Sequence, residues 1–134
     1  MPASTKGKRW WTVAIVLAVV YTVVGVGFAR LANPYPPGAI RFAWRLSAYI
    51  ASAIAFAAHI AYEHRRGSEP VTTAWHTCIA VALGAFGLAA AAAMHSGLPR
   101  IRSAFFVWPI VTAVPAFGAA FVAAWLLRRW IARP

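Results

Sequence analysis

Acidic side chains are almost absent from this sequence of 134 residues. Glu63 and Glu69 are its only carboxylate side chains, and aspartate does not occur. Both glutamates are expected in or beside the loop between the second and third apolar segments, outside the hydrocarbon. Carriers coupled to protons or cations place an acidic residue within the membrane to bind the ion. The sequence therefore argues against this class of transporter.

Cysteine occurs once, as Cys78, so an internal disulfide is excluded. The histidines and the cysteine do not have the spacing of a zinc site, and no glycine-rich loop suits a phosphate group. No serine stands in the strand–turn–helix pattern of a nucleophile elbow. We therefore predict no catalytic residues and no metal site, and the sequence does not indicate an enzyme.

Charged residues make up only 11% of the chain, although the net charge is +11. Soluble domains carry about 25% charged residues. All the Lys and Arg residues lie in the tails, in the loops or close to the ends of apolar segments. Binding to nucleic acid needs a basic stripe or patch, so nucleic acid is not an expected partner. A lipid bilayer with anionic headgroups is the expected one.

Apolar residues are abundant, at 62% of the chain, and they form four long segments. Each segment has about twenty residues or more, which is enough to cross a hydrocarbon core of roughly 30 Å as a helix. We predict an all-α membrane protein with four transmembrane helices in an up-down-up-down bundle with short loops. The transmembrane domain covers 10–127 between basic cytoplasmic tails at 1–9 and 128–134, and its helices are expected at about 10–31, 40–62, 71–94 and 105–127.

The basic residues also predict an orientation. Both tails and the middle loop, on one side of the membrane, hold Lys6, Lys8, Arg9, Arg65, Arg66, Arg128, Arg129 and Arg133. The other side holds Arg30, Arg41, Arg45, Arg100 and Arg102. Cytoplasmic loops carry the excess of Lys and Arg. Since the side with the tails holds eight basic residues and the other side holds five, we expect both termini in the cytoplasm. The expected location is a bacterial inner (plasma) membrane.

Polar side chains recur along the second predicted helix at steps of three, four and seven residues, which places them on one face. A polar face on a membrane helix seldom contacts lipid, so it is expected to face other helices, a cavity or a partner. Its members are Arg41, Arg45, Ser52, His59 and Glu63.

Small side chains form a similar row on the third predicted helix, and such rows let two helix backbones approach closely. The row consists of Ala80, Gly84, Gly87 and Ala91. The short middle loop makes the second and third helices antiparallel neighbours, so the two faces are expected to meet.

His59 and His76 are then expected at similar depth on facing helices. Two imidazoles in this arrangement suit the axial positions of haem b, and a pigment or quinone contact is an alternative. A divalent metal with help from Glu63 or His64 is another alternative. Two interfacial rings that hydrogen-bond to water, headgroups or each other are the simplest interpretation.

Three functions remain open. The first is a non-catalytic structural or accessory subunit of a membrane assembly, with other membrane subunits or a second copy as partners. The second is a haem-binding or pigment-binding redox protein that uses His59 and His76. The third is a small channel or carrier for an anion or other solute, suggested by four arginines on the outer side: Arg41, Arg45, Arg100 and Arg102.

Overall fold

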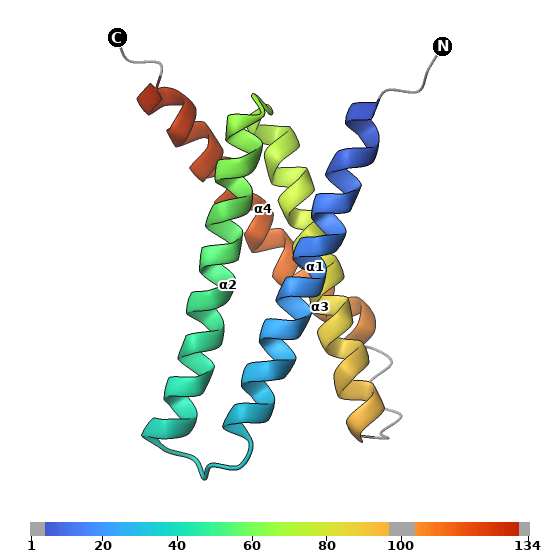
Figure 1. Ribbon diagram of the computed structural model, residues 1–134, viewed down its shortest axis with the longest axis vertical. Helices are drawn as coiled ribbons and strands as arrows, with labels where there is room; N and C mark the ends of the chain where they lie inside the picture. Colours follow the sequence, from blue (N-terminus) through green and yellow to red (C-terminus); the bar gives the residue numbers. More distant parts are fainter. Residues whose placement is uncertain (1–4, 97–103, 132–134) are drawn as a thin grey trace.

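The computed structural model of the protein describes residues 5–96 and 104–131, and every element in these ranges is an α-helix (Figure 1). The helices are α1 (Thr5–Ala32), α2 (Ala39–Arg65), α3 (Pro70–Ser96) and α4 (Ala104–Ile131). Each is long and apolar enough to cross a membrane. The prediction of an all-α membrane protein with four transmembrane helices is confirmed.

The helices extend beyond the predicted spans, most of all at the two ends of the chain. α1 begins at Thr5 and α4 ends at Ile131, so parts of both predicted tails are helical. Lys and Arg are good helix formers, and a spanning helix gives the flanking residues a preformed turn to extend. The helix therefore continues past the apolar run.

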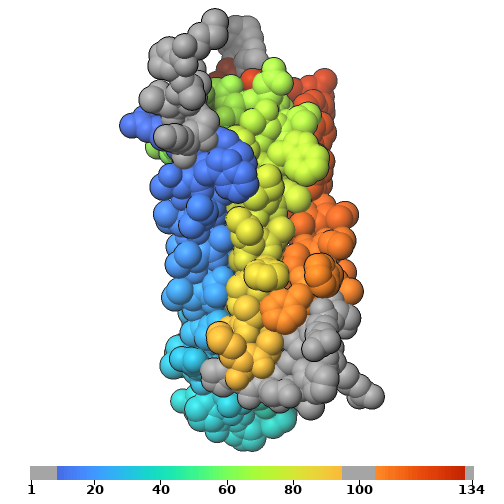
Figure 2. Space-filling model, turned by 90° about the vertical axis from the view of Figure 1, so that its right-hand side faces the viewer, coloured from blue at the N-terminus to red at the C-terminus, as the bar shows by residue number. Residues whose placement is uncertain are grey.

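The helices alternate in direction, so the start of α1, the end of α4 and the α2–α3 turn lie at one end of the bundle (Figure 1). The α1–α2 turn and the end of α3 lie at the other. Figure 2 shows α3 between α1 and α4, and both of these helices pack extensively against it. α2 packs mainly against α1 and touches α3 and α4 much less.

The expectation that the faces of the second and third helices meet is therefore wrong for most of their length. The small-residue row of α3 contacts α1 instead of α2. A Cβ added at Gly84 would lie 2.7 Å from Cβ of Tyr21, and one added at Gly87 would contact the Thr22 side chain. Ala80 and Gly84 are buried, whereas Gly87 and Ala91 are half-buried.

Alanine also lets α4 approach α3 closely. Ala74 of α3 packs with Ala120 and Ala124 of α4 in one core cluster, to which α2 contributes Ile60. A second cluster joins Ala14 and Tyr21 of α1 to Ala80 of α3. The core thus surrounds α3, and α2 is left free to diverge from the other helices.

Candidate functional site

The polar face of α2 divides between two places in the structure. Arg41, Arg45 and Ser52 line a cavity, whereas His59 and Glu63 belong to a buried cluster near the α2–α3 turn. Residues 45 and 59 are separated by about 21 Å along the helix at a rise of 1.5 Å per residue. A single stripe in the sequence therefore contributes to two distinct sites.

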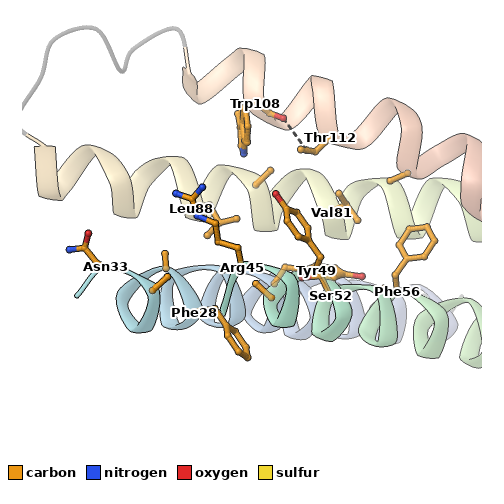
Figure 3. A pocket seen from close by; sticks show the side chains of 18 of the residues that line it. Phe28, Asn33, Arg45, Tyr49, Ser52, Phe56, Val81, Leu88, Trp108 and Thr112 are labelled. Carbon is orange, nitrogen blue, oxygen red and sulfur yellow. Dashed lines mark hydrogen bonds between the residues drawn. The ribbon is translucent and has the colours of Figure 1, made fainter. Parts of the chain in front are cut away.

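The cavity has a volume of about 920 Å³ and lies where α2 diverges from α3 and α4 (Figure 3). Its walls are mostly apolar and come from all four helices. α1 contributes Tyr21, Gly25, Phe28, Ala29 and Ala32, and the α1–α2 turn contributes Asn33; α2 contributes Arg41, Arg45, Ala48, Tyr49, Ser52, Ala53 and Phe56; α3 contributes Val81, Ala85 and Leu88; and α4 contributes Trp108, Thr112 and Ala116.

The cavity is partly open, and aromatic side chains mark its edge. Tyr49 of α2 is 72% exposed and Trp108 of α4 is 52% exposed, although both line it. Figure 3 shows Tyr49 and Trp108 on opposite sides of the space. Both residues belong to helices that are long and apolar enough to cross a membrane.

Two positive charges stand among the cavity-lining residues without a negative partner. Arg41 and Arg45 lie in the first two turns of α2, and neither Glu63 nor Glu69 lines the cavity. Nε of Arg41 is buried and has no hydrogen-bond partner within the described protein, and the same holds for the hydroxyl of Tyr21. Buried polar groups are normally hydrogen-bonded, so both donors are available to a ligand.

The second site is built on Glu63, whose side chain is only 1% exposed. The Ser68 hydroxyl donates a hydrogen bond to Oε2 of Glu63 at 2.5 Å. Nδ1 of His76 lies 3.3 Å from the same oxygen, and Nε2 of His59 lies 4.0 Å from Oε1. We call these four residues, from α2, the turn and α3, the Glu63 cluster.

The turn after α2 places Ser68 over the carboxylate. Gly67 has a φ of 74°, in the left-handed region that glycine adopts without strain. The N–H of Ser68 donates to the carbonyl of Glu63 and the N–H of Gly67 donates to that of His64. These two bonds define a Schellman motif, which brings the Ser68 side chain back to Glu63.

His76 lies between the carboxylate and the outside. Its side chain is 18% exposed, whereas His59 and Glu63 are buried. The indole of Trp10 in α1 stacks on the His76 ring, with centroids 4.4 Å apart and planes inclined by 8°. Although Nδ1 of His76 is within 3.3 Å of Glu63, the two do not form a hydrogen bond, so the distance is suitable but the angle is not.

The sequence placed Glu63 in or beside the loop, which agrees with its position next to the α2–α3 turn, but it did not predict that Glu63 is buried. Glu63 lies in the last turn of α2 and is covered on all sides. α2 continues to Arg65, and the turn then folds over the carboxylate. Ser68 and Trp10 were also missed as partners; Gly67 before Ser68 was the one local signal for the turn that joins Ser68 to Glu63.

His59 and His76 do meet near the α2–α3 turn, but both face the carboxylate of Glu63. Since a carboxylate lies between the rings, this geometry does not favour haem between them. Among the described residues, no group of three or more His, Cys, Asp or Glu side chains is arranged to hold a metal ion. Arg100 and Arg102, which supported the anion hypothesis, lie outside the described residues.

Together, the fold and these sites define a multi-pass membrane protein that has a partly open, mostly apolar cavity and a separate buried histidine–glutamate cluster. No protein family, characterised protein or solved structure matches the chain.

Proposed function

We propose that the protein binds an amphipathic membrane molecule with an anionic headgroup in the cavity between α2 and the α3–α4 pair. The observation that carries this proposal is a cavity of about 920 Å³ with mostly apolar walls, in which Arg41 and Arg45 are the charged residues among the described part of the chain. Guanidinium groups bind phosphate and carboxylate oxygens in bidentate fashion. The apolar walls suit an acyl chain, and because that chain leaves one apolar environment for another, the two guanidinium groups provide the preference for an anionic headgroup.

The dimensions of the cavity favour a lipid over a small inorganic anion. Its lining on α2 runs from Arg41 to Phe56, which corresponds to about 22 Å along the helix. One leaflet contributes roughly 15 Å of hydrocarbon, so the cavity accommodates a chain of leaflet length. An aqueous path for an anion needs polar groups along its length, whereas most of this wall is alanine and aromatic side chains.

An accessory subunit of a membrane assembly is the second candidate, and lipid binding is compatible with it. Its support is the large apolar surface of α1 and α4, which lipid alone also covers. We further propose that the chain lies in a bacterial inner membrane with both termini in the cytoplasm, as the excess of basic residues favours. Arg41 and Arg45 would then lie near the outer headgroups.

Native mass spectrometry of the full chain, taken from nanodiscs of defined composition, tests the proposal. The nanodiscs contain phosphatidylcholine with either phosphatidylglycerol or oleate, so that the phosphate and carboxylate headgroups are compared directly. We expect an anionic lipid to remain bound in preference to phosphatidylcholine. The double variant R41Q/R45Q should lower this preference at least about tenfold, or about 1.4 kcal/mol.

The matched control for charge is R128Q/R129Q, which removes two adjacent exposed arginines from the other end of the bundle. It should retain the lipid. A48F fills the cavity and should displace the acyl chain, whereas A119F adds the same bulk on an exposed position of α4. Equal retention by all four variants contradicts the proposal, and a stoichiometric co-purifying protein in place of lipid favours the accessory subunit.

A further inference from the structure

The Glu63 cluster combines three titratable side chains with no permanent counter-charge. Among the described side chains, the ion-pair partners within 4.0 Å of Glu63 are His59 and His76, which are charged only when protonated. Each element around the carboxylate can be named. α2 brings His59, α3 brings His76, the turn brings Ser68, and α1 brings Trp10 through its stack on His76.

Other charged groups near the cluster point elsewhere. α4 contributes Ala120 and Ala124 to the apolar cluster around Ile60, one turn below Glu63. Arg65 and Arg66 follow Glu63 in the chain but are exposed, and Arg66 contacts Tyr62. Glu69 is also exposed. Among the described side chains, no Lys or Arg forms an ion pair with Glu63, so His59 and His76 are the groups that can compensate its charge there.

The charge balance follows from counting protons. When Glu63 is ionised and both imidazoles are neutral, the buried carboxylate has no counter-charge. When two protons are added to this state, the cluster has a net positive charge although it is buried. Both states are costly, since an uncompensated charge is expensive to remove from water. With one proton, held by Glu63 or by either imidazole, the cluster is neutral.

We propose that His59, Glu63 and His76 form a proton-binding site that exchanges one proton with the water on the side of the α2–α3 turn. His76 is the route, because it is the only one of the three with an exposed part. Its ring accepts a proton from water at Nε2 and releases the proton on Nδ1 to Oε2 of Glu63, so no charge accumulates on the ring. A small rotation of the ring converts the 3.3 Å contact into the hydrogen bond that this transfer requires.

The site supplies an acid within a spanning helix, which the sequence had seemed to lack. The Glu63 cluster begins about one helical turn beyond the cavity, since Phe56 is the last residue of α2 that lines the cavity and His59 follows it by three residues. The proposal does not depend on a ligand in that cavity. A purely structural Glu63, which only ties Ser68 to α2, is the alternative that an experiment must separate.

NMR of the full chain in micelles, with carbon-13 in the glutamate carboxyl groups and nitrogen-15 in the histidine rings, makes this separation. The chain has two glutamates, so two signals are expected, and E69Q assigns them. The signal of Glu63 should shift with pH at the same midpoint as the ring nitrogens of His59 and His76, because interacting groups titrate as a unit. Glu69, exposed at the same turn, is the internal control.

The variant H76Q adds the test of the route. It keeps a polar side chain of similar reach but cannot carry a proton, so the shared midpoint should be lost and the Glu63 signal should move separately. A Glu63 signal that stays constant through the pH range in which the histidines titrate overturns the proposal. So does a Glu63 midpoint that is unchanged in H76Q.

Discussion

The contact between α1 and α3 at Gly84 gives the sharpest test of how this bundle is held together. A Cβ placed there would lie 2.7 Å from Cβ of Tyr21 and 3.4 Å from the carbonyl oxygen of Ala18. The distance to the Ala18 oxygen is an ordinary contact, but Cβ of Tyr21 is too close, and it is fixed to the α1 backbone, so a side-chain rotation cannot relieve the clash. Gly84→Ala must therefore move the two helices apart. The movement also stretches the 3.3 Å contact between the Thr22 hydroxyl and the carbonyl of Gly84.

The cost of G84A is best measured against a second glycine in a spanning helix. A Cβ at Gly118 of α4 meets no atom within 4 Å, so G118A has the same gain in helix propensity, up to about 1 kcal/mol, without a clash. Overpacking typically costs about 1–3 kcal/mol. We expect G84A to be less stable than G118A by this amount.

The assay is equilibrium unfolding in mixed micelles with increasing SDS, followed by the loss of helical circular dichroism. Both variants and the unmodified chain are measured at one lipid composition. G118A should unfold at an equal or higher SDS fraction than the unmodified chain, and G84A at a lower one. If G84A is as stable as G118A, the close approach of α3 to α1 at this position is incorrect, and the neighbours assigned to α3 must be revised.

Three further outcomes are expected. Y21F removes a buried hydroxyl without a partner and should leave the stability of the ligand-free protein equal or raise it by up to about 1 kcal/mol in the same assay. S68A removes the hydrogen bond to Glu63 and should destabilise by about 1–3 kcal/mol, as for a buried acceptor that loses its donor; an effect below about 0.5 kcal/mol contradicts this. In a C78A background, a membrane-impermeant maleimide added to intact cells should label N33C but not E69C, and the reverse pattern inverts the proposed orientation.

The four spanning helices were predictable because hydrocarbon imposes a simple requirement. A segment of about twenty apolar residues satisfies its backbone in lipid only as a helix, whatever its neighbours are. Which helices pack together was harder to predict from the sequence. The glycines at 84 and 87 indicated a close approach, but the matching small residues of α1, at 14, 18, 22 and 25, were overlooked in the sequence.

Periodicity grouped five residues of α2 into one polar face, and it did not predict that they divide between two sites. Periodicity indicates which face of a helix a residue lies on, but not over what length a neighbouring helix stays packed against that face. Here α2 diverges from α3 and α4, so the Arg45 end borders a cavity while the His59 end remains packed. Tyr21 of α1 lines the same cavity and was missed, because a single tyrosine in an apolar segment carries no signal of its own.

Glu63 shows why charged residues near a helix end are the hardest to interpret from sequence. Hydropathy assigns them to water, and for Arg65 and Arg66 this is correct, since both are exposed. Glu63 differs because the glycine turn returns Ser68 to it, and because His59 and His76 close over it from two helices. The burial of Glu63 thus depends on the turn and on the neighbouring helix, and the hydropathy of the α2 segment contains no information on either. A carboxylate at the end of a spanning helix can therefore be buried, as Glu63 is. The absence of carboxylates from the middle of the spans does not exclude proton coupling.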